Sequence, residues 1–292
     1  MRLCDVRGCV SSRLEKAGIE TFEYVTWVLM DHFLHVRRED YFEDPFREAD
    51  PEKVSRLEEA VAGREKRIPL QYLTGQAPFM GFTFMVDERV LIPRYDSESL
   101  VEACENYIKS TDKKENEESV GQEDFRILDL CTGSGCIGIS LAIRCPGTKV
   151  TLSDVSPDAL CVAGENAHRL GADVQIRCGD LFEAVPEKFN LIVSNPPYIP
   201  TADIGTLMPE VRDHEPARAL DGREDGLYFY RQIVREAPAH LEDGGRLFME
   251  IGWDQGPALL EMLSEAGYTE IEIRQDLSGR DRIAAGTVIH ER

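Results

Sequence analysis

The tetrapeptide Asn195-Pro196-Pro197-Tyr198 directly follows an apolar run at residues 189–194. The run predicts a buried strand, which the two prolines end because they have a fixed φ and no N–H group. Asn195 is then expected at the carboxyl end of the strand, where open α/β sheets bind ligands. An Asn amide beside a proline carbonyl can hold a planar NH2 group, and a Tyr ring can cover its face. The tetrapeptide therefore predicts chemistry on an amide or base-amine nitrogen, with a rigid turn as the alternative.

A glycine-rich loop follows an earlier predicted strand, residues 126–130, and spells G-x-G-x-x-G with Gly133, Gly135 and Gly138. Glycines let the backbone approach a ligand closely. Asp154 ends the next predicted strand, where an acid can accept hydrogen bonds from two ribose hydroxyls. This spacing alone fits NAD as well as S-adenosylmethionine.

Two further acids favour S-adenosylmethionine over NAD. Asp129 stands just before the glycine loop, where a carboxylate can pair with an amino group but repels a pyrophosphate. Asp180 ends the third predicted strand, where it can accept a hydrogen bond from an adenine amine. Three acids on one sheet edge suit a cationic ligand that carries an amino group and a ribose. Singly, each acid is equally well explained as a turn or helix-capping residue.

Strands and helices alternate from residue 126 onward, which predicts an α/β fold with a mostly parallel sheet and helices on both faces. The predicted strands are 126–130, 149–153, 173–178, 189–194, 245–251, 268–274 and 282–289. The predicted helices are 136–144, 156–170, 225–241 and 256–266. The last two strands are joined by a loop too short for a helix, so they are expected to be antiparallel neighbours. We therefore expect a seven-stranded sheet with one reversed strand.

The chain divides into three predicted parts: a helical domain at 1–75, a β-hairpin linker at 76–95 and an α/β domain at 96–292. In the helical domain, Asp50 and Pro51 predict the start of one helix, and Thr21 predicts the cap of another. In the linker, residues 82–86 and 90–92 are the expected hairpin strands. Residues 109–124 are almost entirely polar and predict a loop.

The net charge of −21 and the pI near 4.7 make the protein a poor binder of nucleic-acid backbone. No apolar stretch is long enough for a membrane span, and the N-terminus does not resemble a signal peptide. The eight Cys residues are interpreted as free thiols in a reducing compartment, which predicts a cytoplasmic location. No His/Cys cluster has the spacing of a zinc site, so no metal is expected.

With these motifs in hand, the chain resembles the class I methyltransferases, and more closely the HemK-type protein-(glutamine-N5) methyltransferases that modify peptide chain release factors. The resemblance covers nearly the whole chain. It is carried by IPLQYLTG (68–75), VLIPRYDSESLVE (90–102), ILDLCTGSGCIGISLA (127–142), FNLIVSNPPYIP (189–200), HEPARALDGREDGL (214–227), MEIGWDQ (249–255) and DLSGRDRIA (276–284). Departures from the family pattern are Tyr95 in place of a proline, Ser97 in place of a threonine, Cys131 in place of a glycine and Leu181 in place of an aromatic residue.

The resemblance implies a Rossmann-like sheet and methyl transfer from S-adenosylmethionine to the side-chain amide of the glutamine in a Gly-Gly-Gln motif. The protein partner is then a release factor, docked by the helical domain, with no direct nucleic-acid or membrane partner. Implied substrate-binding and catalytic residues are Asn195, Pro196, Pro197 and Tyr198. Implied cofactor-binding residues are Cys131, Thr132, Gly133, Ser134, Gly135, Asp154, Asp180, Leu181 and Asn195.

Three alternatives to this function stay open at the level of sequence. They are an adenine N6-methyltransferase acting on nucleic acid, an NAD-dependent oxidoreductase and a binding module without activity. The acidic charge argues against the first, and the lack of a clear His acid or base argues against the second. Glu250 is interpreted as structural, and the His214-Glu215-Pro216 segment either lines the substrate channel or braces its loop.

Overall fold

The computed structural model describes residues 1–114, 125–276 and 278–290, with the side chains of residues 112–114 left out. Two compact units divide the chain. The first comprises Met1–Gln76 and Met208–His214, and the second comprises Ala77–Leu207 and Glu215–Arg292. The short segment 208–214 therefore belongs to the helical unit although it lies far along the sequence, which the sequence did not predict. The hairpin region groups with the second unit.

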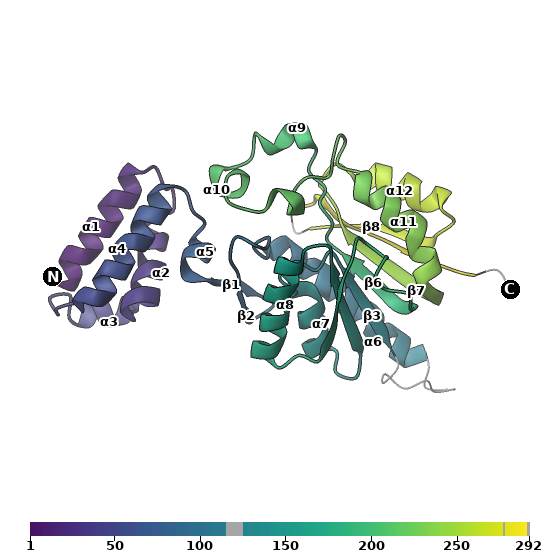
Figure 1. Ribbon diagram of the computed structural model, residues 1–292, viewed down its shortest axis with the longest axis horizontal. Coiled ribbons are helices and arrows are strands. Elements are labelled where there is room, and N and C mark those ends of the chain that lie inside the picture. The colour runs from purple at the N-terminus through teal and green to yellow at the C-terminus, as the bar shows by residue number, and fades with distance from the viewer. Residues whose placement is uncertain (115–124, 277, 291–292) are drawn as a thin grey trace. The chain divides into compact units, whose positions relative to one another are not determined.

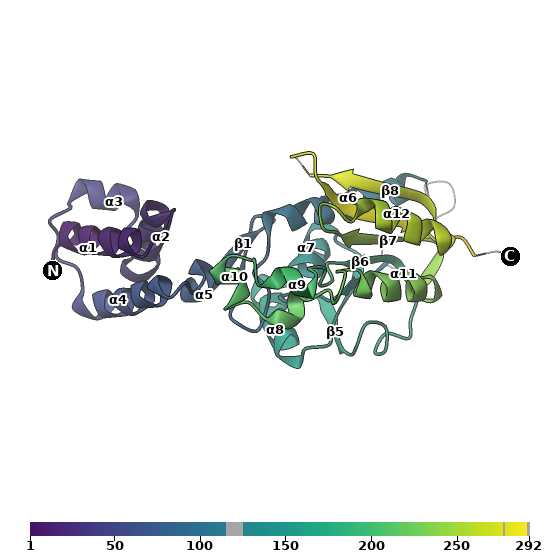
Figure 2. The ribbon, with the colours of Figure 1, turned by 90° about the horizontal axis from the view of Figure 1, so that it is seen from above.

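The first unit is a helical bundle in which α1, α2 and α4 pack on one another (Figures 1 and 2). Its helices are α1 Leu3–Lys16, α2 Phe22–Leu34, α3 Arg38–Glu43, α4 Pro51–Glu65, α5 Leu70–Thr74 and, from the later segment, α10 Pro209–Arg212. Asp50 caps α4 as predicted, since its carboxylate accepts a hydrogen bond from Glu52 N at 2.9 Å. The predicted cap Thr21 makes no side-chain capping bond.

A short β-hairpin opens the second unit, but at a different place from the predicted one. Its strands are β1 Gln76–Phe79 and β2 Phe82–Met85, and residues 90–92 form no strand. Met80 and Gly81 between them have φ of 52° and 81°, the double left-handed conformation of a tight two-residue hairpin turn. Methionine is an unusual residue for this turn, so the prediction placed the turn several residues too late.

Seven strands of the described chain form the main sheet in the order β5-β4-β3-β6-β7-β9-β8. Their bounds are β3 Arg126–Leu130, β4 Lys149–Asp154, β5 Val174–Cys178, β6 Phe189–Ser194, β7 Leu241–Glu250, β8 Thr269–Gln275 and β9 Asp281–Thr287. β9 pairs antiparallel with both β7 and β8, whereas the other pairs are parallel. The predicted seven-stranded sheet with one reversed strand is confirmed.

Helices cover both faces of this sheet (Figure 1). One face carries α6 Glu98–Lys114, α7 Cys136–Arg144 and α8 Pro157–Leu170, and the other carries α11 Tyr228–His240 and α12 Gly256–Glu265. The predicted loop at 109–124 is wrong at its start, because α6 continues to Lys114, and its remainder lies outside the described residues. The strand predicted at 245–251 begins at Leu241, directly after α11.

Among the described helices, none is both long and apolar enough to cross a membrane. All eight Cys residues lie in described parts of the chain and are free thiols.

Candidate active site

The main pocket lies where the strand order reverses. The chain runs from β3 outward to β4 and β5, then returns to β6 on the other side of β3. The loops after β3 and β6 leave toward opposite faces, which opens a crevice at the carboxyl ends of these strands. Nine of the twelve residues predicted from sequence line this pocket: Cys131, Thr132, Gly133, Ser134, Asp154, Asp180, Leu181, Asn195 and Pro197. Gly135, Pro196 and Tyr198 are not among the lining residues.

The loop after β3 passes through the left-handed backbone region at Cys131, Gly133 and Gly135, with φ of 61°, 56° and 82°. A Cβ atom on Gly133 would meet no atom within 4 Å, so a ligand has room to approach the backbone there. A Cβ atom on Gly135 would lie 2.6 Å from Ile139 Cδ1. The two glycines therefore differ in what they permit: Gly133 leaves space for a ligand, and Gly135 allows the loop to pack on α7.

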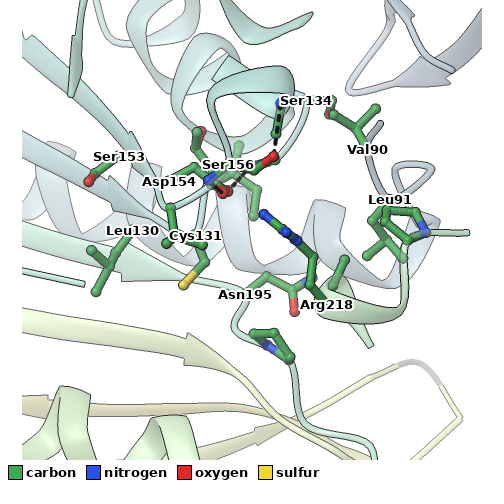
Figure 3. A pocket seen from close by; sticks show the side chains of 18 of the residues that line it. Val90, Leu91, Leu130, Cys131, Ser134, Ser153, Asp154, Ser156, Asn195 and Arg218 are labelled. Carbon is green, nitrogen blue, oxygen red and sulfur yellow. Dashed lines mark hydrogen bonds between the residues drawn. The ribbon is translucent and has the colours of Figure 1, made fainter. Parts of the chain in front are cut away.

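Asp154, at the end of β4, holds the glycine loop in place. Its Oδ2 accepts a hydrogen bond from Gly133 N at 2.9 Å. Its Oδ1 accepts one from Ser156 N, also at 2.9 Å, and these two residues lie side by side in the pocket (Figure 3). Burial raises the pKa of Asp154, while these two N–H donors and the nearby Arg218 act in the opposite direction. Each carboxylate oxygen has a further lone pair, so Asp154 can also accept hydrogen bonds from ligand hydroxyl groups.

Asp129 does not line the pocket, in contrast to the ligand-pairing role that the sequence suggested. It is fully buried behind the glycine loop, where its Oδ2 accepts hydrogen bonds from Thr132 Oγ1 at 2.6 Å and Gly138 N at 2.8 Å. Its Oδ1 has no hydrogen-bond partner among the described residues. Burial raises the pKa of Asp129 to about 7. In this structure the residue braces the loop from behind.

Asn195 follows β6 and borders the pocket, with the Arg218 side chain reaching between it and Asp154 (Figure 3). The Asn195 Nδ2 atom donates to Ser97 Oγ at 3.3 Å. Pro197 lines the pocket beside it. This arrangement leaves the Asn195 carbonyl oxygen as an acceptor for a ligand amine.

Tyr198 lies behind the pocket wall and packs against the apolar core between the sheet, α11 and α12. Its hydroxyl donates to Glu250 Oε1 at 3.4 Å, and burial raises its pKa. Glu250, at the end of β7, also accepts a hydrogen bond from Ser97 Oγ and is only 1% exposed. The sequence analysis named Ser97 only as a departure from the family pattern and Glu250 only as structural, and it missed the hydrogen bonds that join them to Asn195.

Several lining residues were not predicted as site residues by the sequence analysis, and two of them bear on ligand binding. Phe229 at the start of α11 and Arg218 in the loop after β6 line the pocket together with Asp180 and Leu181. Phe229 supplies an aromatic ring that the Leu181 position lacks. Arg218 lies in the segment HEPARALDGREDGL, which resembles the family pattern and could have drawn attention to it. The segment alone does not indicate that the Arg218 side chain borders the pocket.

The His214-Glu215-Pro216 segment is divided between the two units. His214 belongs to the helical unit, where its Nε2 is 3.1 Å from Lys66 O. Glu215 belongs to the second unit, where its buried carboxylate accepts hydrogen bonds from Ile92 N and the Arg94 guanidinium. Glu215 therefore braces the backbone beside the pocket, and Pro216 lines the pocket itself.

Comparison with known proteins gives matches to two domain families and to full-length relatives. The Methyltransferase small domain family matches residues 117–208, and the PrmC N-terminal domain family matches residues 6–75. The chain is 40% identical over 276 residues to the release factor glutamine methyltransferase of Geobacter sulfurreducens, an alignment that covers 94% of this chain and 93% of that protein. It is 38% identical over 290 residues to the protein of the same name from Cereibacter sphaeroides, with 98% of each chain covered.

A solved structure shows the same fold. A methyltransferase from Pyrococcus furiosus superimposes with a TM-score of 0.50 at 16% identity, covering 72% of this chain and 90% of that chain. The sheet and its flanking helices thus form a class I methyltransferase fold. Since relatives of this identity match over nearly their whole length, the chain belongs to the family of release factor glutamine methyltransferases.

Proposed function

We propose that the protein transfers a methyl group from S-adenosylmethionine to the side-chain amide nitrogen of the glutamine in the Gly-Gly-Gln motif of a peptide chain release factor. The observation that carries the proposal is the placement of Asn195 beside the glycine loop and Asp154 in one pocket at the switch point of the sheet. Family membership supports the same activity and the same class of protein substrate.

In the proposed reaction, the Asn195 Oδ1 and the Pro196 carbonyl accept hydrogen bonds from the two N–H groups of the glutamine amide. Methyl transfer to this nitrogen would release the thioether S-adenosylhomocysteine, and the nitrogen would lose one proton to solvent. Pro197 shapes the pocket, and Tyr198 supports the Asn-Pro-Pro backbone from behind. An amide nitrogen is a poor nucleophile because its lone pair is delocalised. Two fixed acceptors orient this nitrogen, and positioning of this kind supplies about 7–11 kcal/mol in favourable cases. The same acceptors bind more strongly as positive charge develops on nitrogen, which lowers the barrier further.

The cofactor would be held by the glycine loop and the acids around it. Space at Gly133, the free lone pairs of Asp154 and the acidic Asp180 fit a nucleoside that carries a positive charge. When bound, S-adenosylmethionine supplies an electrophilic methyl group on a sulfonium. Cys131, Thr132 and Ser134 would contact it through the loop, and Leu181 with Phe229 would provide apolar cover. Burial raises the pKa of Cys131, so we assign its thiol a packing role.

Mass spectrometry of a bacterial release factor, incubated with this protein and S-adenosylmethionine, tests the proposal. We expect one added methyl group on the motif glutamine. The Asn195→Ala variant should lose about 100-fold or more in turnover, since it removes one of two transition-state acceptors. Asn106→Ala, on an exposed part of α6, is the matched control and should retain wild-type turnover.

A second methyl acceptor makes the test selective. Duplex and single-stranded DNA test the alternative activity, an adenine N6-methyltransferase. If the proposal is correct, neither DNA should receive a labelled methyl group. Label on DNA alone would contradict the proposal, as would full turnover by Asn195→Ala. A cytoplasmic location, where release factors act, is part of the same proposal.

A further inference from the structure

A chain of buried polar groups contacts Asn195, and its first member, Ser97, also lines the pocket. Ser97 and Glu250 are 2% and 1% exposed, and the Ser97 hydroxyl bonds both Glu250 Oε2 and Asn195 Nδ2. Tyr198 donates to the other oxygen of Glu250. Ser97 comes from the short helix Tyr95–Ser97 before α6, and Glu250 comes from the end of β7. Residues far apart in sequence are therefore joined by hydrogen bonds to the carboxamide of Asn195.

The direction of each hydrogen bond follows from the chemistry of the groups. An ionised carboxylate only accepts hydrogen bonds, and a serine hydroxyl has one proton to donate. Once Ser97 donates that proton to Glu250, only lone pairs remain on its oxygen. The Asn195 group that faces Ser97 must then be the NH2, because the Asn195 oxygen would meet a second acceptor there.

Three neighbours of Glu250 favour the ionised form on which this direction depends. Burial raises its pKa, while Ser97, Arg282 and Tyr198 favour the charged form. Arg282 is itself paired with Asp96 and Asp276, both at 3.2 Å, so it stays fixed near the site. Tyr230 is held to the backbone of the same residue, since its hydroxyl donates to Glu250 O at 2.8 Å.

We propose that Ser97, oriented by Glu250, is a positioning residue that selects one of the two flip states of the Asn195 carboxamide. In the selected state, the Asn195 oxygen faces the pocket and can accept a hydrogen bond from a substrate amine. In the opposite state, an NH2 group would face the substrate NH2, and no hydrogen bond could form. This inference rests on the proposed acceptor role of Asn195 and assigns the residues that enforce it.

Turnover of Ser97 variants on the release factor provides the first test. Ser97→Ala should lower kcat by roughly 5- to 30-fold, which corresponds to the free energy that one hydrogen bond to a charged group contributes. The Kd for S-adenosylmethionine, measured by calorimetry, should change by less than about twofold, because the Ser97 hydroxyl bonds Glu250 and Asn195, although the residue lines the same pocket. Ser97→Thr keeps the hydroxyl and should restore turnover. The matched control, Ser99→Ala, removes a hydroxyl that donates to Asp96 O at 2.7 Å and should leave kcat unchanged.

The Asn195 side-chain NH2 signals in a 15N NMR spectrum provide a second test that needs no methyl acceptor. Comparison with Asn195→Asp assigns the pair. We expect the two protons to exchange slowly with solvent in the wild type and in Ser97→Thr, and at least tenfold faster in Ser97→Ala.

The two tests separate this inference from the proposed function. If the wild type methylates no release factor but the NMR result holds, the proposed activity is wrong and the positioning role stands. If Ser97→Ala keeps both wild-type kcat and slow exchange, the positioning role is overturned whatever the substrate. The same conclusion follows if Ser97→Ala weakens cofactor binding in proportion to kcat, since Ser97 would then act on the fold of the site as a whole.

Discussion

Asp129 is a fully buried carboxyl group with one hydrogen-bonded oxygen and one that has no partner in the described part of the chain. Its pKa in the folded protein is about 7, whereas an ordinary Asp has a value near 3.8. The protonated form is therefore favoured by folding. Because the folded pKa lies above the unfolded one, the stability contributed by this group is fully present below about pH 4 and is lost as the pH rises toward about 7.

We expect Asp129→Asn to remove this pH dependence. Between pH 5 and pH 8 the wild type should lose on the order of 3 kcal/mol of unfolding free energy relative to the variant, since one pKa unit corresponds to about 1.4 kcal/mol. Urea unfolding at both pH values measures the difference. Asp173→Asn, at an exposed position, should follow the wild type. Parallel pH profiles for the wild type and Asp129→Asn would contradict the assignment.

At the scale of single residues, the sequence predicted some of the site residues but not the direction or the contacts of others. Motif spacing placed Asn195, Asp154 and the glycine loop at the same sheet edge, and the structure brings them together. It did not reveal that Asp129 points behind the loop, because successive strand residues face opposite sides and a single acid does not indicate which side is the pocket. The Ser97–Glu250 contact could not be found either, since it joins positions 153 residues apart.

At the scale of elements, the approach of α7 to the sheet is set by Gly138. A Cβ atom there would lie 2.3 Å from Leu152 Cδ2 on β4 and 2.9 Å from Asp129 Cβ on β3. Any side chain would push α7 away from both strands and disturb the start of the glycine loop.

Gly138→Ala should therefore lower the free energy of unfolding by about 3 kcal/mol, the upper range for overpacking a core. The matched control is Gly164→Ala in α8, where the new methyl group would meet only the end of the Ile176 side chain at 3.3 Å. There we expect a change within about 1 kcal/mol, because relief of helical glycine entropy offsets the tight contact. Equal urea midpoints for the two variants would show that α7 can shift freely.

Periodicity was sufficient to predict the order of strands and helices in the second unit, including the reversed β9. It failed where a backbone conformation is set by tertiary structure. Met80 adopts a left-handed turn that its residue type does not favour, so the hairpin was misplaced. The early start of β7 at Leu241 was missed because its first residues include a polar, glycine-rich stretch.

At the scale of the whole molecule, the segment Met208–His214 ties a late part of the chain to the helical unit. Glu210 in this segment accepts hydrogen bonds from Arg64 at 2.8 Å and Arg67 at 3.3 Å. The Arg64 and Glu210 side chains are only 10% and 17% exposed, so this pair is shielded from solvent more than a surface ion pair.

Glu210→Gln should destabilise the helical unit by about 2 kcal/mol, since it removes charge-assisted hydrogen bonds and leaves two guanidinium groups facing a neutral amide. The protein has two Trp residues, and Trp27 lies in the helical unit. In a Trp253→Phe background, Trp27 fluorescence should report the lower urea midpoint. Glu224→Gln, an exposed residue of the second unit, should leave the Trp27 transition unchanged.

The helical unit is built from two separate stretches of the sequence, so no continuous part of the gene encodes it. Seven residues that complete the N-terminal bundle are encoded within the catalytic half of the gene. A gene cut after codon 76 would separate Arg64 and Arg67 from Glu210, with which both form ion pairs. We therefore expect that an exchange of the helical unit must include residues 208–214, and that the two stretches change together over evolution.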